Sequence, residues 1–272
     1  MNTTQVEGDQ ARREFPAIEL PPERARRLRI GNLVVGLLHL AQVAALLALS
    51  TDFVLPVTET FPSGPPGTAP PQPQALFDLP LGFAVAAFVG LAALDHLLVG
   101  GPASRWYAAR LRAGINPARW VEYSVSASLM VVLIAMLSGI VDVTALTALF
   151  GANVAMILFG VRMERVNDQT SGRVDWEPFV HGCIAGLFPW IAILISVTGA
   201  EAESGQVPGF VFAIIVSLFL FFMSFAVNQW LQYRRVGPWR DYVFGEWAYL
   251  VLSLGAKSAL AWQVFANVLI ES

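Results

Sequence analysis

Long apolar segments, separated by short polar connections, set the pattern of this chain. Seven segments fall near residues 30–51, 78–100, 117–140, 142–162, 177–199, 207–232 and 242–270. Each is close to the ~20 residues that a helix needs to cross about 30 Å of hydrocarbon. The pattern predicts an all-α membrane protein, with a seven-transmembrane helix bundle as its main domain over residues 30–270.

The first 29 residues differ from this pattern. They are polar, with arginines and acids mixed together, and the apolar segment that follows is too long for a secretory signal. We expect a basic N-terminal tail over residues 1–29. Within it, residues 1–20 are predicted to be partly disordered and residues 21–29 to lead into the first helix.

The basic residues alternate between connections. Arginines precede the first segment and then occupy every second connection, as Arg105, Arg110, Arg112 and Arg119, then Arg162, Arg165 and Arg173, then Arg234, Arg235 and Arg240. The other connections carry acids and no basic residue. Because basic residues favour the cytoplasmic side, we predict a multi-pass protein of the cell membrane, with its N-terminus cytoplasmic and its C-terminus extracellular.

The connection over residues 52–77 is unusually long and rich in proline. On the predicted topology it is extracellular. A connection of this length is usually functional or disordered. Its composition leaves two interpretations open, a mobile tether and an ordered flap over the outer end of the bundle.

Composition supports the membrane class. The chain is 56% hydrophobic and 14% charged, whereas soluble domains have about a quarter of charged residues. The single Cys183 excludes an intrachain disulfide and is expected to be a small buried side chain. The three histidines lack metal-ligand spacing, so no metal is predicted. No hydrolase or transferase constellation is present, and nothing indicates a nucleic-acid partner, so we do not expect an enzyme.

Lys257 is the only lysine, and it lies in the middle of the seventh apolar segment. An ammonium group at this depth is costly and therefore needs a partner or a function. Two explanations are open from the residues alone. The lysine can be held in a structural ion pair, or its amine can condense with an aldehyde to form a Schiff base.

Glu122, near the start of the third segment, is the candidate partner of Lys257, because a neighbouring carboxylate stabilises a buried cation. The alternative is a carboxylate that faces water at the headgroup boundary. Ser253 lies one turn before the lysine and on the same helix face. Asp95 and Glu246 are near the same predicted side of the membrane as Glu122, where we expect them to be solvated.

His39 and His96 fall within the first and second segments. Each alone is best explained as a structural histidine. Together with Glu122 they form a candidate proton-accepting polar cluster, because histidine takes up a proton near neutral pH. Aromatic residues are abundant in the fifth and sixth segments and can line an elongated apolar slot or face lipid.

Three stretches carry a resemblance to a known family. Leu252–Phe265, with Lys257, resembles the seventh helix of the heliorhodopsins. Trp120-Val121-Glu122-Tyr123-Ser124 resembles their third helix, and Asn228–Tyr233, followed by arginines, resembles the end of their sixth. The inverted orientation and the long first outer connection agree with this family, and the resemblance covers roughly residues 30–270.

This resemblance implies all-trans retinal bound to Lys257 as a Schiff base, Glu122 as counterion, Ser253 beside the Schiff base, and His39 and His96 in a polar cavity. It also implies a homodimer with the ordered 52–77 connection at the interface. Further residues that it places around the chromophore are Trp120, Tyr123, Met130, Asn153, Ile157, Phe222 and Gln229. Where the family often has a small hydroxyl residue near the second-helix histidine, this chain has Ala92.

The expected function is that of a light-sensing retinal protein that signals, through an unidentified cytoplasmic partner, without pumping ions. Pumping rhodopsins resemble one another in an aspartate one turn before the lysine, where this chain has Ser253. They also carry an acid pair on the third helix, whereas the positions one and two turns after Glu122 are Ser126 and Met130 here. Two alternatives are a light-driven or light-gated proton transporter and a scaffold without a chromophore.

Overall fold

The computed structural model describes residues 16–62, 64–65, 67, 72–170 and 173–269. Within these residues, seven helices are long and apolar enough to cross a membrane. They are α1 (Pro22–Leu49), α2 (Leu81–Gly100), α4 (Pro117–Leu137), α5 (Val143–Val166), α6 (Glu177–Ser204), α7 (Gly209–Arg234) and α8 (Tyr242–Val264). The seven-helix membrane class is confirmed.

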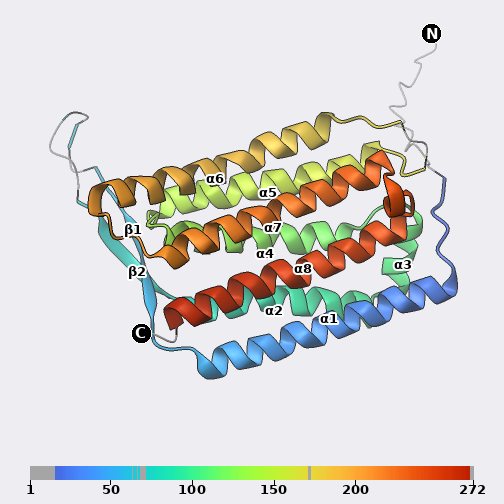
Figure 1. The fold of residues 1–272 in the computed structure, drawn as a ribbon, viewed down its shortest axis with the longest axis horizontal. Coiled ribbons are helices and arrows are strands. Elements are labelled where there is room, and N and C mark those ends of the chain that lie inside the picture. Colours follow the sequence, from blue (N-terminus) through green and yellow to red (C-terminus); the bar gives the residue numbers. More distant parts are fainter. Residues whose placement is uncertain (1–15, 63, 66, 68–71, 171–172, 270–272) are drawn as a thin grey trace, which may run out of the picture.

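The helices form one elongated bundle (Figure 1). α2 packs between α1 and α4, α5 packs between α4 and α6, and α8 closes the other side against α7, α1 and α2. In contrast, α6 and α7 make little direct backbone contact. Side chains of both helices line the candidate site, which lies between them and α4, α5 and α8.

Several boundaries differ from the sequence prediction. α1 begins at Pro22 rather than near residue 30, so the arginine-rich lead-in is itself helical. Proline is tolerated in the first helical turn, and arginine and glutamate are good helix formers. A short helix, α3 (Ser104–Arg112), occupies the connection after α2. Of the predicted disordered tail, residues 1–15 lie outside the described residues.

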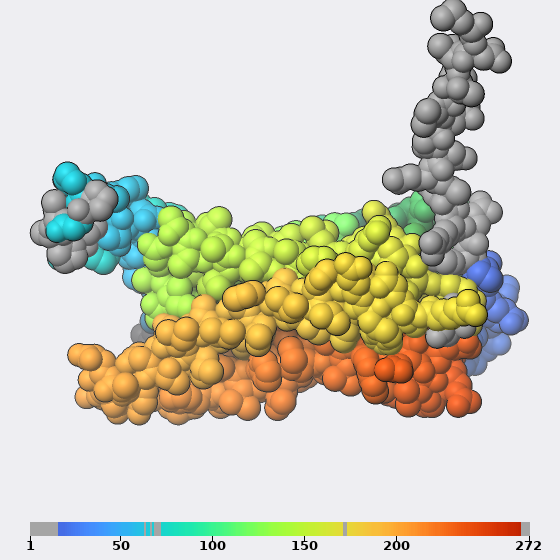
Figure 2. Space-filling view, turned by 90° about the horizontal axis from the view of Figure 1, so that it is seen from above, coloured from blue at the N-terminus to red at the C-terminus, as the bar shows by residue number. Residues whose placement is uncertain are grey.

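The 52–77 connection contains secondary structure that the sequence did not predict. β1 (Val54–Glu59) and β2 (Gln74–Pro80) form an antiparallel hairpin, so α2 starts at Leu81 rather than at 78. The hairpin stands out at one end of the bundle (Figure 2). Thr58 N donates to Val141 O at 2.9 Å, which ties the hairpin to the connection between α4 and α5. We call this the hairpin end.

The opposite end contains α3 and the 3₁₀ helix η1 (Gly237–Arg240), and we call it the α3 end (Figure 1). The largest apolar core fills the half of the bundle nearer the hairpin. Past the end of α8, the chain continues as a π-helical turn, η2 (Phe265–Leu269). The polar residues of interest therefore lie in the middle of the bundle and toward the α3 end.

Candidate retinal-binding site

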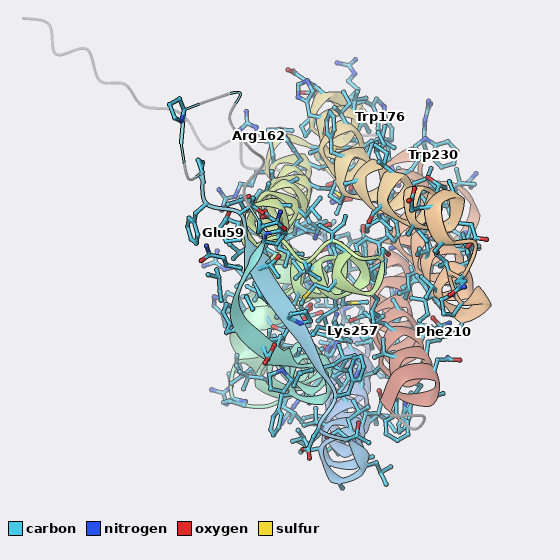
Figure 3. All side chains as sticks on the ribbon, turned by 90° about the vertical axis from the view of Figure 1, so that its left-hand side faces the viewer. Glu59, Arg162, Trp176, Phe210, Trp230 and Lys257 are labelled. Carbon is cyan, nitrogen blue, oxygen red and sulfur yellow. The ribbon has the colours of Figure 1, made fainter. Side chains whose placement is uncertain are left out.

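Lys257 lies on α8 and points into the bundle, as Figure 3 shows from the hairpin end. Its side chain is 3% exposed. Nζ donates to Ser253 Oγ at 3.0 Å, a contact that the i−4 spacing on α8 dictates. The same nitrogen lies 3.4 Å from Glu122 Oε2 and 4.7 Å from the centre of the Tyr123 ring. The ammonium group is thus held by an anion, a hydroxyl and an aromatic face.

Glu122 is buried on α4, so it does not face water at the headgroup boundary. Only Oε2 faces Lys257. The second oxygen, Oε1, is buried with no hydrogen-bond partner among the described residues. A buried polar atom of this kind normally has a partner, so the carboxylate keeps capacity for one more donor.

A cavity of about 370 Å³ opens beside Lys257, between α4, α5, α6, α7 and α8. Its walls are mostly apolar, and Trp190 makes edge-to-face contacts with both Phe219 and Phe222 at 5.3 Å between ring centres. Seven of the predicted site residues line it: Trp120, Tyr123, Met130, Ile157, Phe222, Gln229 and Lys257. Residues from four helices are therefore brought to one slot that ends at the amine.

Three predicted residues lie beside this cavity rather than on its wall. Glu122 and Ser253 contact Lys257 from outside the slot. Asn153 is buried and donates to Ser128 Oγ at 3.0 Å, so its amide joins α5 to α4. The resemblance placed Asn153 near the chromophore, but it is not among the residues that line the cavity.

Sequence reasoning missed several wall residues. Tyr249 lies two turns before Lys257 on α8, and this spacing could have identified it. Met156 and Phe179 had no such signal, because only the packing of α5 and α6 brings them to the slot. The expectation for Cys183 was wrong, since it is exposed and lines the cavity on the α6 side.

His39 and His96 are buried side by side, with ring centres 5.9 Å apart and an interplanar angle of 11°. His96 Nδ1 lies 2.8 Å from Asn32 Oδ1, which fixes one side of that ring. Both His39 nitrogens and His96 Nε2 have no hydrogen-bond partner among the described residues. The pair therefore has unused proton-binding capacity, although within those residues no hydrogen bond joins it to Glu122.

A second buried polar cluster lies one turn from Glu122, toward the α3 end. Arg119 forms ion pairs with Glu164 on α5 and Glu246 on α8, the latter at 2.6 Å. Asn116 donates to both carboxylates, at 2.8 and 2.7 Å. The expected solvated role of Glu246 is wrong, because this carboxylate is buried and paired. Arg119, counted with the connections from sequence, is buried as well.

Among the described residues, there is no group of three or more histidine, cysteine or acidic side chains that could hold a metal ion. The fold and the site instead define a seven-helix membrane protein with one buried lysine beside an apolar slot, which is the architecture of the microbial rhodopsins. A sequence profile described as heliorhodopsin matches residues 28–269. The chain belongs to the heliorhodopsin family.

Solved structures support the fold. The light-driven proton pump LR (Mac) from Leptosphaeria maculans aligns with a TM-score of 0.66 at 15% identity, over 93% of this chain and 98% of the other. Bromide-bound halorhodopsin from Halobacterium salinarum aligns with a TM-score of 0.61 at 14% identity, over 90% and 96%. A search of curated proteins found no significant match.

Family membership implies a retinal chromophore, and the residues of this site fit one. An elongated polyene aldehyde needs an apolar slot and an amine at its end. The slot is walled by aromatic side chains, and Lys257, the only lysine, supplies the amine. The unpartnered Oε1 of Glu122 lies on a carboxylate that already neutralises this amine.

Proposed function

We propose that this protein is a light sensor, rather than an enzyme, in which Lys257 carries all-trans retinal as a Schiff base. The observation that carries the proposal is the position of Nζ, which faces an aromatic-walled cavity on one side and Glu122 on the other. When bound, retinal supplies light absorption and a change of shape on isomerisation. The protein supplies the amine, the counter-charge and the apolar cavity.

The roles of the residues follow from their contacts. Glu122 neutralises the positive charge at Nζ, and Ser253 orients the nitrogen through its hydroxyl. Tyr123 places an aromatic face near the same cation, which favours the charged form. The His39 and His96 pair is the candidate acceptor for a proton that leaves Nζ, because its ring nitrogens are unused.

Signalling without pumping is supported by the half of the bundle between Lys257 and the hairpin end. The core there consists of apolar side chains such as Phe88, Ile134 and Leu260. Among the described residues, the buried charged groups are Glu122, Lys257 and the Arg119 cluster, and none lies in that half. A proton released at Nζ therefore meets buried histidines and carboxylates on one side only, because the polar groups of the hairpin half, such as Ser217 and Gln263, are hydroxyls and amides. This favours reversible movement of the proton over transport.

The proposal is tested by adding all-trans retinal to the apoprotein of wild type and Lys257→Ala. We expect a visible absorption band in the wild type, bleached by hydroxylamine, and no such band in the variant, because no other lysine is present. Ser258→Ala, a neighbour on α8 that contacts Gln42, is the matched control and should keep the band. A band unchanged in Lys257→Ala would show that retinal binds elsewhere or not covalently.

A proton transporter is the second candidate, favoured by the unpartnered histidine nitrogens. Photocurrents in a voltage-clamped cell separate the two. We expect no sustained current in the wild type, since the described residues in the hairpin half of the bundle include no buried charge. A sustained current that His96→Ala abolishes would replace the sensor by a transporter.

We also propose that the N-terminus is cytoplasmic and that light changes the α3 end, where an unidentified signalling partner would bind. The arginines concentrate at this end, in α1, α3 and η1. Labelling of a cysteine introduced before α1 in intact cells, with Cys183 replaced by serine, tests the orientation. Labelling by an impermeant reagent from outside would contradict it.

A further inference from the structure

A second concave site lies at the α3 end, far along the bundle from the hairpin. A groove of about 320 Å³ opens between the first turns of α1, the last turn of α2 and α3. Its floor is apolar and belongs to a compact cluster of Leu20, Leu28, Val99, Tyr107 and Leu111. Its rim is basic, with Arg26, Arg29, Arg105 and Arg112 and the hydroxyl residue Ser104. None of the described residues that line it is acidic.

The charges on this rim are not compensated within the described residues. Arg29 Nε donates to the backbone oxygen of Gly100 at 2.9 Å, and Arg112 reaches the backbone oxygen of Leu20 at 3.5 Å. A carbonyl oxygen accepts a hydrogen bond but does not cancel a charge. Arg26 and Arg105 are exposed and have no ion pair there.

Arginines just outside the groove behave differently. Arg24 pairs with Asp241, and Arg27 pairs with Glu23 at 2.6 Å. Acids are thus available at this end of the bundle, yet they bind the neighbouring arginines and leave the rim free. Within the part of the chain that the structure describes, four guanidinium groups without an ion pair surround one groove and favour an anion, and guanidinium matches the oxygens of phosphate in geometry.

The surroundings indicate where the phosphate comes from. Directly beyond the groove, α1 exposes Ile30, Val34 and Leu37, and α2 exposes Leu94 and Leu98. These side chains form the surface that faces hydrocarbon in a membrane-spanning bundle. Trp106, beside Arg105, is 44% exposed, as expected for a side chain at headgroup level. The groove therefore sits where a lipid phosphate lies, with apolar surface below it for acyl chains.

We propose that this groove binds a phosphate group, presented by the headgroup of an anionic phospholipid whose acyl chains run along α1 and α2. Basic grooves between membrane helices bind anionic headgroups for this reason. The site is independent of the retinal cavity, because none of its residues lines that cavity. The protein would accordingly prefer a membrane leaflet rich in anionic lipid at its α3 end.

The test measures retention of dioleoyl-phosphatidylglycerol by native mass spectrometry of the full chain in detergent, with dioleoyl-phosphatidylcholine as the neutral comparison. The variant Arg26→Gln/Arg105→Gln removes two rim charges. Arg27→Gln/Arg110→Gln removes two charges from the same helices outside the groove. All four side chains are exposed, so both variants should fold, which circular dichroism verifies.

We expect the wild type to retain phosphatidylglycerol in preference to phosphatidylcholine. The rim variant should bind phosphatidylglycerol about 25-fold more weakly, since each arginine near a headgroup contributes roughly fivefold. The control variant should change it about twofold or less. If millimolar inorganic phosphate displaced phosphatidylglycerol, the groove would still be a phosphate site, but its ligand would be a free phosphate rather than a lipid. No lipid preference in the wild type, or equal loss in both variants, would overturn the proposal.

Discussion

At the scale of single residues, the centre of the protein is one buried ion pair with incomplete hydrogen bonding. Lys257 Nζ has Glu122 and Ser253 as partners, while Glu122 Oε1 has none among the described residues. A buried charge is stable only with its counter-charge present, so each member of the pair depends on the other. The colour of bound retinal should report this dependence directly.

Glu122→Gln tests it. The substitution removes the anion but keeps the shape of the side chain. It leaves an uncompensated charge at Nζ, which costs about 3–5 kcal/mol in a buried pair. We expect the visible absorption band to move and thermal stability to fall, with added chloride partly reversing the shift. Absorption spectra of the purified protein measure the effect.

Ser126→Ala is the matched control, one turn further along α4 and also buried. It removes a polar group without removing charge, so its band should stay near that of the wild type. An unshifted band in Glu122→Gln would show that another group neutralises Lys257.

At the scale of elements, the hairpin stands out from one end of the bundle and exposes apolar side chains (Figure 2). Phe77 and Leu76 on β2 are 54% and 45% exposed. Neighbouring strand residues point to opposite faces, so both faces of the hairpin expose an apolar side chain. Exposed apolar surface beyond the helix ends indicates a protein interface. We propose that two hairpins meet in a homodimer.

Phe77→Ser should weaken this dimer. Loss of a buried phenylalanine costs about 1.5–3 kcal/mol, so the dissociation constant should rise about tenfold or more. Sedimentation of the protein in detergent over a range of concentrations measures the change. Val180→Ser on α6 removes a similarly exposed side chain at the other end and should leave the dimer intact. Equal behaviour of the two variants would remove the hairpin from the interface.

At the scale of the whole molecule, Arg119 is the point where three helices are joined by charge. Its guanidinium binds Glu164 of α5 and Glu246 of α8. The guanidinium carbon, Cζ, lies 3.8 Å from the centre of the Tyr249 ring. Tyr249 also lines the cavity. A change in the cavity can therefore reach the α3 end through Tyr249 and Arg119.

Arg119→Gln should destabilise the bundle by about 3–5 kcal/mol, because two buried carboxylates lose their counter-charge. The triple variant Arg119→Met/Glu164→Leu/Glu246→Leu should recover most of this loss, since apolar side chains of similar volume can replace a buried ion cluster. Thermal unfolding in detergent measures both. A single variant as stable as the wild type would show that the carboxylates find other partners or become neutral.

Much of the fold could be predicted from the sequence, because the local composition of a segment determines whether it can cross a membrane. About 20 apolar residues without charge must form a helix in lipid, where every backbone group needs an internal partner. The number of spans followed from this rule and from the alternation of arginines. Lys257 was identifiable for the same reason, since a lone lysine in an apolar helix is costly.

The tertiary structure alone decided which polar groups meet. Glu246 was expected to be solvated and Glu164 was not singled out, but the packing of α4, α5 and α8 buries both against Arg119. Asn153 turns to Ser128 rather than lining the slot. The hairpin depends on pairing between strands whose residues lie far apart in sequence, and the groove under α3 on three separate segments. Local composition determines which segments form membrane-spanning helices. Contacts between those helices depend on side-chain packing, which no local pattern in the sequence encodes.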